Sequence, residues 1–303
     1  MNQKKRMVVV GGAGFIGGHL AEALLFLGWG VEVIDNLSGG KRENVPRGAK
    51  LHVLDIRNYD DIFPIINGAD CVFHLAALPR VQFSIDYPLE THSVNTTGLL
   101  NVFLAAKNGR VRRVVYSASS SAYGNQETLP LQEDFRPLPV SPYGLQKYIG
   151  EEYARIFADI YGLETVSLRY FNVFGPRLDP EGPYALVIGK FLKQKKEGIP
   201  LTITGDGTQT RDFTHVRDVV RANILAAESD RVGRGEVMNI GAGKNVSMNT
   251  LAELIGGRIE YIPARKEPHD TLADNSRAKA LLNWEPTITL LEGLLELKKE
   301  WGL

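Results

Sequence analysis

Three glycines in one short segment, Gly11, Gly14 and Gly17, place the strongest constraint on how this chain folds. An apolar run precedes them and a stretch with helical spacing follows, which is the strand–loop–helix order of a dinucleotide-binding unit. In such a unit the glycines permit a tight turn, close approach of the backbone to a pyrophosphate and close helix–strand packing. The free N–H groups at the start of the helix favour an anion there. A plain turn between a strand and a helix is the alternative for the glycines alone.

A carboxylate at the end of the next apolar run supports the dinucleotide interpretation. Asp35 can accept hydrogen bonds from the adenosine ribose hydroxyls and repels a 2′-phosphate, so it favours NAD over NADP. Lys41 and Arg42 follow a few residues later and leave NADP open. Asp55, at the end of the third apolar run, is placed to meet the adenine. Its alternative role is to cap the helix that starts near Asn58.

Apolar runs alternate with amphipathic stretches through about the first 170 residues, the pattern of a parallel sheet with crossover helices. The fold class predicted is α/β, with a Rossmann-type doubly wound parallel sheet and a smaller mixed α/β substrate-binding lobe at the C-terminal end. We assign residues 1–170 to the dinucleotide-binding domain, with 212–242 returning to it, and 171–211 and 243–303 to the lobe. Strands are expected at 7–10, 31–34, 51–54, 71–75, 114–116 and 165–168, helices at 15–27, 59–66, 89–107, 143–161, 216–228, 248–255, 276–282 and 290–301, and loops at 174–184 and 201–210.

Overall charge and cysteine count exclude several classes of function. Lys plus Arg and Asp plus Glu number 35 each, so the net charge is zero, whereas a nucleic-acid-binding protein is normally basic over a broad face. Cys71 is the only cysteine, which excludes an intrachain disulfide and a thiolate metal cluster, and the six histidines form no metal-like cluster. No apolar stretch reaches the roughly 20 residues that span a bilayer. We therefore expect a cytoplasmic protein that binds no metal, membrane or nucleic acid.

A tyrosine and a lysine four residues apart, Tyr143 and Lys147, are the second feature with chemical meaning. On a helix they lie on one face, one above the other. A neighbouring ammonium favours the ionised form of a phenol whose pKa is ordinarily about 10, so Tyr143 can serve as a base at neutral pH. Beside a dinucleotide that accepts hydride, the pair predicts redox chemistry at a carbon that bears a hydroxyl. An ordinary amphipathic helix face is the alternative for the pair alone.

Several motifs, taken in order, resemble the extended short-chain dehydrogenase/reductase family and, within it, the nucleotide-sugar 4-epimerases. The resemblance covers about residues 7 to 290 and implies an isomerase with tightly bound NAD that interconverts UDP-glucose and UDP-galactose through a transient 4-keto sugar. It implies that Tyr143 is the acid and base at the sugar 4-hydroxyl, that Lys147 holds the nicotinamide ribose and that Ser119 bonds the same hydroxyl. The motifs are the glycine loop, Asp35-Asn36-Leu37, Asp55-Ile56-Arg57, His74-Leu-Ala-Ala77, Ser117-Ala-Ser-Ser-Ser-Ala-Tyr-Gly124, Tyr143-x-x-x-Lys147, Arg169-Tyr-Phe-Asn172 and residues 205–215.

The resemblance also implies which residues bind the cofactor and the substrate. Asn172 and Arg211 would bind the diphosphate of a UDP-sugar, and Arg265 stands one residue later than the family's usual phosphate-binding arginine. Structural alternatives are an ion pair between Arg211 and Asp212, a polar strand exit at residues 119–121, and packing roles for His74 and His215. The cofactor set is Gly11, Gly14, Phe15, Ile16, Gly17, Asp35, Asn36, Asp55, Ile56, Leu75, Ala76, Ala77, Asn95, Tyr143, Lys147 and Tyr170. The substrate set is Ser119, Asn172, Val187, Thr204, Arg211, Arg265 and Thr271.

The loop after Ser119 distinguishes the reactions found in this family. No carboxylate follows Ser119 until Glu127, so nothing obvious protonates a leaving hydroxyl as in the dehydratases, and epimerisation is the prediction. The alternatives are a UDP-glucuronate 4-epimerase or decarboxylase, with Arg80, Ser84 or Thr271 on the uronate carboxylate, and a non-catalytic NAD-binding module. Thr271 aligns with the position beside the sugar C2 substituent. Because the Thr271 side chain is small, it would leave room for an N-acetyl group, so UDP-GlcNAc and UDP-GalNAc are expected as further substrates.

A homodimer is also expected from the resemblance, through a bundle of the helices at 89–107 and 143–161. The apolar candidates for that face are equally suited to packing on their own sheet. They are Phe103, Leu104, Ile149, Tyr153 and Ile156.

Overall fold

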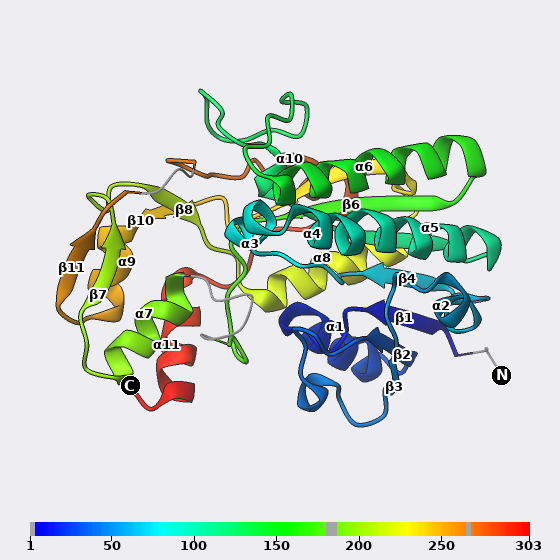
Figure 1. The fold of residues 1–303 in the computed structure, drawn as a ribbon, viewed down its shortest axis with the longest axis horizontal. Coiled ribbons are helices and arrows are strands. Elements are labelled where there is room, and N and C mark those ends of the chain that lie inside the picture. The colour runs from blue at the N-terminus through cyan, green and yellow to red at the C-terminus, as the bar shows by residue number, and fades with distance from the viewer. Residues whose placement is uncertain (1–3, 180–186, 265–267) are drawn as a thin grey trace.

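A seven-stranded parallel sheet forms the centre of the protein, and six of its strands match the six predicted ones (Figure 1). The computed structural model describes residues 4–179, 187–264 and 268–303. The strand order changes direction between the first and fourth strands, as in a doubly wound sheet, so the predicted fold class is confirmed. Across the sheet the order is β3 (Lys50–Val53), β2 (Gly30–Asp35), β1 (Arg6–Val10), β4 (Cys71–His74), β5 (Arg113–Ser119), β6 (Glu164–Tyr170) and β9 (Arg234–Ile240).

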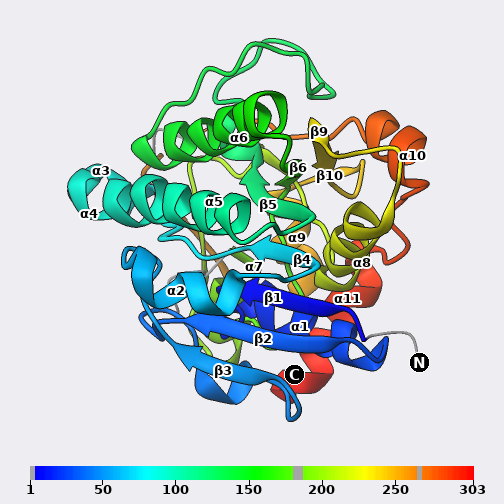
Figure 2. The same cartoon turned by 90° about the vertical axis from the view of Figure 1, so that its right-hand side faces the viewer.

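Helices cover both faces of the sheet, and each face has its own apolar core (Figure 2). On one face lie α1 (Phe15–Phe26), α8 (Val216–Glu228) and α10 (Ser276–Leu282). On the other lie α2 (Tyr59–Ile66), α5 (Leu99–Asn108) and α6 (Pro142–Tyr161). The helix expected at 89–107 is instead made of α4 (Pro88–His92), a π-helical turn at Ser93–Gly98 and α5, and a short helix that was not expected, α3 (Val81–Asp86), precedes it.

A smaller lobe lies beside one end of the sheet, with its own core (Figure 1). Its helices are α7 (Val187–Lys196), α9 (Met248–Ile255) and α11 (Leu290–Trp301). Two small sheets complete it. In one, β7 (Leu201–Thr204) pairs in parallel with β11 (Ile259–Ile262), and in the other, β8 (Thr210–Asp212) pairs antiparallel with β10 (Asn245–Ser247).

The prediction of a loop at 201–210 is wrong, because this segment contains β7 and the start of β8. Leu201 and Ile203 are buried while the threonines between and after them are half-buried, which is the alternation of a strand with one face on a core. The loop was predicted because of Gly205 and Gly207, but these glycines have positive φ values and form only the turn after β7. In the loop expected at 174–184, residues 174–179 contain no helix or extended strand, and the remainder lies outside the described residues.

Contacts between the lobe and α1 join the two parts of the molecule. His19 on α1 has Nε2 2.9 Å from the carbonyl oxygen of Pro176, and Lys41 forms a 2.6 Å ion pair with Asp179. Phe15 at the start of α1 packs against the core of the lobe. Among the described helices, none combines the length and apolar character needed to cross a membrane.

Arg113 at the start of β5 fixes the return of the chain to the main sheet. Its side chain is almost fully buried and donates to the carbonyl oxygens of Ala226, Ser229 and Val232 at 2.7–2.8 Å. Its Nε donates to Glu164 at 2.8 Å. These carbonyls lie at the end of α8 and in the turn before β9, so one guanidinium satisfies three carbonyl oxygens of this connection.

Replacing Arg113 with Met should therefore destabilise the protein, because three buried carbonyl oxygens lose their donor. We expect the free energy of unfolding to fall by about 3 kcal/mol, measured as the shift in the urea midpoint. Arg110→Met, at an exposed position nearby, is the matched control and should change the midpoint little. Equal effects of the two substitutions would contradict the anchoring role of Arg113.

Candidate active site

The glycine loop between β1 and α1 has the close backbone contacts that its sequence predicts. Gly11 has a φ of +85°, and a Cβ added there would lie 2.5 Å from the nitrogen of Ala76. A Cβ at Gly17 would lie 2.2 Å from the carbonyl oxygen of Gly11. Gly14 occupies the N-cap of α1, which has no side-chain cap. The N–H groups that begin α1 are therefore not covered by a capping side chain, as a pyrophosphate site requires.

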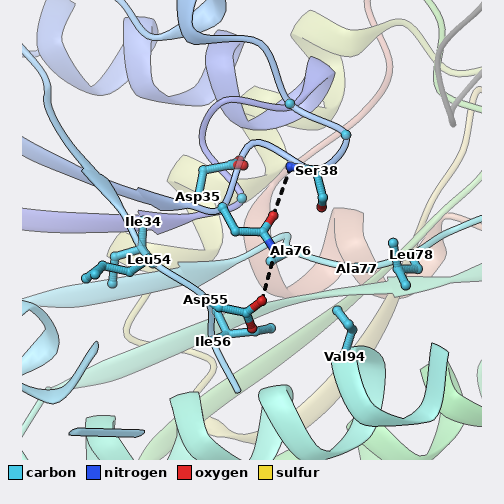
Figure 3. A pocket seen from close by; sticks show the side chains of 14 residues that line it. Ile34, Asp35, Ser38, Leu54, Asp55, Ile56, Ala76, Ala77, Leu78 and Val94 are labelled. Atoms are coloured by element: carbon cyan, nitrogen blue, oxygen red, sulfur yellow. Dashed lines mark hydrogen bonds between the residues drawn. The ribbon is translucent and has the colours of Figure 1, made fainter. Parts of the chain in front are cut away.

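A cavity opens to solvent beside this loop, between the ends of β1, β2, β3 and β4 (Figure 3). Seven of the predicted cofactor residues line it: Gly11, Asp35, Asn36, Asp55, Ile56, Ala76 and Ala77. Seven others that line it were not predicted, and two of these, Ile34 and Leu54, directly precede the two strand-end carboxylates. The other five are Ser38, Gly39, Gly40, Leu78 and Val94.

Asp35 lies at the end of β2 with its carboxylate in this cavity (Figure 3). It accepts hydrogen bonds from the backbone nitrogens of Ala13 at 3.0 Å and Leu37 at 2.8 Å. Burial raises the pKa of Asp35, and these two N–H groups oppose the shift. A carboxylate can accept about four hydrogen bonds, so capacity for ribose hydroxyls remains. Lys41, one of the two basic residues that left NADP open, forms an ion pair with Asp179.

Asp55 belongs to a polar cluster at the end of β3 and does not cap a helix. The N-cap of α2 is Asn58, so the alternative of a helix cap is wrong. Both carboxylate oxygens of Asp55 accept from the Arg57 guanidinium, at 2.7 and 2.9 Å, and these bonds hold the pKa of Asp55 well below its usual range. Asn36 donates to the same carboxylate at 3.0 Å (Figure 3). Asp55 is therefore a charged acceptor on the cavity wall.

Helix α6 supplies the candidate base. Ser141 caps its N-terminus by accepting from the nitrogen of Gly144 at 3.1 Å, and Pro142 occupies the first turn, so the helix begins immediately before Tyr143. The backbone nitrogen of Tyr143 donates to Ser84 at 3.0 Å. The hydroxyl of Ser119, at the end of β5, lies near enough to the phenol to lower the pKa of Tyr143. Tyr143, Lys147 and Ser119, the three predicted catalytic residues, are thus brought to one place.

We expected Lys147 to favour an ionised Tyr143, but in the structure the pKa of Tyr143 is raised. Burial raises the pKa of Tyr143 to about 12, and the neighbouring Ser119 hydroxyl only partly offsets this shift. Burial likewise lowers the pKa of Lys147 to about 7. The ammonium lies 6.0 Å from the centre of the Tyr143 ring and donates to the carbonyl oxygen of Ser117 at 2.6 Å. In the protein alone, desolvation therefore outweighs the attraction between the two side chains.

Asn95 and Tyr170, both in the predicted cofactor set, serve other contacts in the structure. Asn95 is buried, accepts from the nitrogen of Leu78 at 2.7 Å and donates to Gln146 on α6 at 2.8 Å, so it fixes the loop after β4. The Tyr170 hydroxyl donates to Asn223 on α8 at 2.9 Å. Like these two, Gly14, Phe15, Ile16, Gly17, Leu75, Tyr143 and Lys147 lie outside the lining of the cavity.

Three of the predicted substrate residues converge around β8. Asn172 donates to the carbonyl oxygen of Asp212 at 2.8 Å, and the Asp212 nitrogen lies 3.3 Å from the Thr271 hydroxyl. Arg211 lies between them on β8 and donates to the carbonyl oxygen of His269 at 2.9 Å. Thr204 ends β7 and Val187 begins α7. Arg265 lies outside the described residues.

The contacts of Asp212, His74 and His215 bear on two of the structural alternatives. The Asp212 carboxylate accepts from the backbone nitrogens of Ala242, Gly243 and Ala273 at 2.6–3.0 Å, which are contacts of a loop anchor and not of the Arg211–Asp212 ion pair. His74 and His215 are both buried, stacked on Tyr116 and edge-on to Phe174 respectively, as packing residues are. The part of the chain that the structure describes has no group of three potential metal ligands.

Comparison with known proteins agrees with this geometry. A family model described as the NAD dependent epimerase/dehydratase family matches residues 7–241, most of the chain. The chain belongs to this family. Its cofactor is therefore NAD, as Asp35 and the glycine loop predicted, and the protein is an enzyme of the nucleotide-sugar epimerase/dehydratase group.

Solved structures of this family overlie almost the whole chain. UDP-glucose 4-epimerase from Thermotoga maritima, solved with UDP-glucose, is 38% identical with a TM-score of 0.92, covering 98% of each chain. UDP-N-acetylglucosamine 4-epimerase from Methanobrevibacter ruminantium is 38% identical with a TM-score of 0.91, covering 98% of this chain and 99% of that one. UDP-glucuronic acid 4-epimerase from Bacillus cereus, solved with UDP-glucuronic acid and NAD, is 32% identical with a TM-score of 0.90, again covering 98% and 99%.

Replacing Gly17 with Ala should remove NAD, because the new Cβ would lie 2.2 Å from the carbonyl oxygen of Gly11 and push the glycine loop away from the phosphates. We expect the purified variant to release far less nucleotide than the wild type on denaturation, measured by chromatography. Gly30→Ala is the control, since its Cβ meets the nearest atom, the carbonyl oxygen of Lys5, at an ordinary 3.6 Å. A full nucleotide content in Gly17→Ala would rule out this loop as the phosphate site.

Proposed function

We propose that this enzyme is a 4-epimerase that interconverts UDP-glucose and UDP-galactose, and that also accepts the N-acetylhexosamine forms. The observation that carries the proposal is the placement of Ser119 beside the Tyr143 phenol, with Lys147 one helical turn further along α6, next to the NAD domain. The first carboxylate that follows Ser119 along the chain, Glu127, is exposed to solvent. A dehydratase needs an acid to protonate the departing hydroxyl, and Ser119 to Ser121 offer none.

The proposed chemistry needs one proton transfer in each direction. Tyr143 takes the proton of the sugar 4-hydroxyl as C4 loses hydride, which leaves a 4-keto sugar, and returns the proton when hydride is added to the other face. Ser119 bonds the same hydroxyl and holds it against the phenol. When bound, NAD supplies the hydride acceptor and then the donor, so there is no net redox change. Lys147 favours the phenolate electrostatically once it is protonated.

The proposed substrate site lies around β8. Arg211 and Asn172 are suited to the diphosphate, since a guanidinium and an amide both donate to phosphate oxygens. Thr271 is proposed beside the sugar C2 substituent, and Thr204 and Val187 beside the nucleotide. The substrate role of Arg265 stays a prediction. The same holds for the cofactor roles of Tyr170, Asn95 and the other residues of the cofactor set.

A uronate substrate is less well supported by the contacts. Ser84, one of its three candidate partners, is fully buried, donates to the carbonyl oxygen of Val81 and accepts from the nitrogen of Tyr143. Its hydroxyl is therefore already used in holding α6. A decarboxylase would be recognised by a product lighter by carbon dioxide, and a non-catalytic module by the absence of any turnover.

We also propose that the protein assembles as a homodimer through α4, α5 and α6. Leu89, Leu145 and Ile160 on these helices are apolar and exposed, so they are available for a second copy. One of the predicted contact residues, Phe103, is not available to a second copy, because it is fully buried against Phe157 in the core of its own chain. Leu104, Ile149, Tyr153 and Ile156 are half-buried and stay candidates.

Tyr143→Phe should lower turnover of UDP-galactose by roughly 100- to 10,000-fold, because the proton of the 4-hydroxyl loses its acceptor. NAD content should stay at the wild-type level, since the ring remains in place. Product formation and released nucleotide are measured on the same preparation. Near-normal turnover would refute the assignment of the base.

Wild-type protein should convert UDP-GlcNAc, and Thr271→Tyr should reduce that activity more than its activity on UDP-galactose, because a large side chain would fill the space for the N-acetyl group. We expect the ratio of the two kcat/KM values to change by about tenfold or more. A parallel fall on both substrates would indicate damage to β8. If the wild type leaves UDP-GlcNAc unchanged while converting UDP-galactose, the broad specificity is excluded.

A further inference from the structure

Three polar residues follow one another at four-residue spacing along the buried face of α6: Tyr143, Lys147 and Glu151. They are 9%, 4% and 2% exposed. Residues at this spacing are neighbours on a helix, so Lys147 lies between the phenol of the candidate base and a carboxylate. The first two belong to the proposed catalytic site, whereas the proposed reaction makes no use of Glu151.

Glu151 is held by a buried bidentate ion pair with Arg169 on β6. Arg169 Nε donates to Oε1 at 2.8 Å and Nη2 donates to Oε2 at 2.6 Å. The guanidinium in turn lies 4.3 Å from the centre of the Tyr123 ring. Burial raises the pKa of Glu151, and the bonds from Arg169 oppose that shift. A fork of two parallel hydrogen bonds keeps the carboxylate both oriented and ionised.

The other titratable groups that face Lys147 carry no negative charge at neutral pH. Tyr116 on β5 lies 5.1 Å from the ammonium and stays protonated, because burial raises its pKa. His74 on β4 is neutral, because burial lowers its pKa to about 3. Tyr143 is protonated in the protein alone. Among the described groups around Lys147, Glu151 is therefore the one that favours the ammonium, and it opposes the burial that lowers the pKa of Lys147 to about 7.

We propose that Glu151 is a positioning residue that keeps Lys147 protonated beneath Tyr143, and that Arg169 keeps Glu151 charged and in place. The inference rests on the proposed function, since it gives Glu151 a part in preparing the base of that reaction. A neutral Lys147 would leave the phenolate without a nearby cation from the chain. The negative charge one helical turn away thus extends the active form of the site to higher pH.

The titration of Lys147 in the NAD-loaded protein tests this directly. Nζ is followed by NMR of protein labelled with 15N-lysine, and its signal is assigned by its absence in Lys147→Met. In Glu151→Gln the midpoint should fall by roughly one pH unit or more, because removing a nearby negative charge makes the ammonium lose its proton more easily. The alkaline limb of kcat/KM for UDP-galactose should move to lower pH by the same amount.

The neighbouring Glu152 provides the matched control. It is about half exposed and pairs with Arg155 on the outside of α6, so Glu152→Gln should leave both the midpoint and the limb unchanged. Equal midpoints in the two variants would overturn the proposal. If Glu151→Gln fails to fold because Arg169 is left unpaired, the double variant Glu151→Gln with Arg169→Met removes both charges, and its midpoint should fall in the same direction.

The NMR measurement does not depend on turnover. A wild type that converts no UDP-sugar would refute the proposed function, while the Lys147 midpoint would still decide the role of Glu151. An active wild type with an unchanged midpoint in the variants would leave the function standing and refute the role.

Discussion

Helix α6 turns charged side chains toward β5 and β6, where water does not reach them, and the candidate site depends on how that burial is compensated. The ammonium of Lys147 has one backbone carbonyl as its hydrogen-bond acceptor and one carboxylate for its charge. Burying an ionised group costs several kcal/mol unless partners replace the lost water. Ser117 and Arg169 stand on β5 and β6, which pair with each other and pack against α6, and Glu151 stands on α6 itself.

The sequence predicted the main sheet well because both of its faces are buried. Strands such as β1 and β4 are short runs that are apolar almost throughout, which is typical of strands buried on both faces of a sheet. It predicted the lobe less well. There β7 is a strand of four residues with only Leu201 and Ile203 buried, and β8 is shorter still, so the pairing with distant β11 and β10 decides their structure. The residues of β7 and β8 alone do not indicate that these strands pair with β11 and β10.

The candidate site was predictable where a residue type carries its own chemistry, as at Asp35, Tyr143 and Lys147. The sequence did not predict those residues of the site whose part depends only on where the folded chain places them. Ser38 and Val94 line the cavity beside the glycine loop because the chain passes there, and Asn95 turns its side chain to Leu78 and Gln146. The protonation of Tyr143 and Lys147 was also beyond the sequence, since spacing reveals their attraction and only the folded protein reveals their desolvation.

The contacts of His19 with Pro176 and of Lys41 with Asp179 connect the nucleotide half of the molecule to the chain that enters the lobe. One of the donors belongs to the same helix that begins at the glycine loop. The lobe is therefore joined to the nucleotide half by side chains as well as by the polypeptide itself. A substitution at either His19 or Lys41 would remove one of these links and leave the apolar core of the lobe intact.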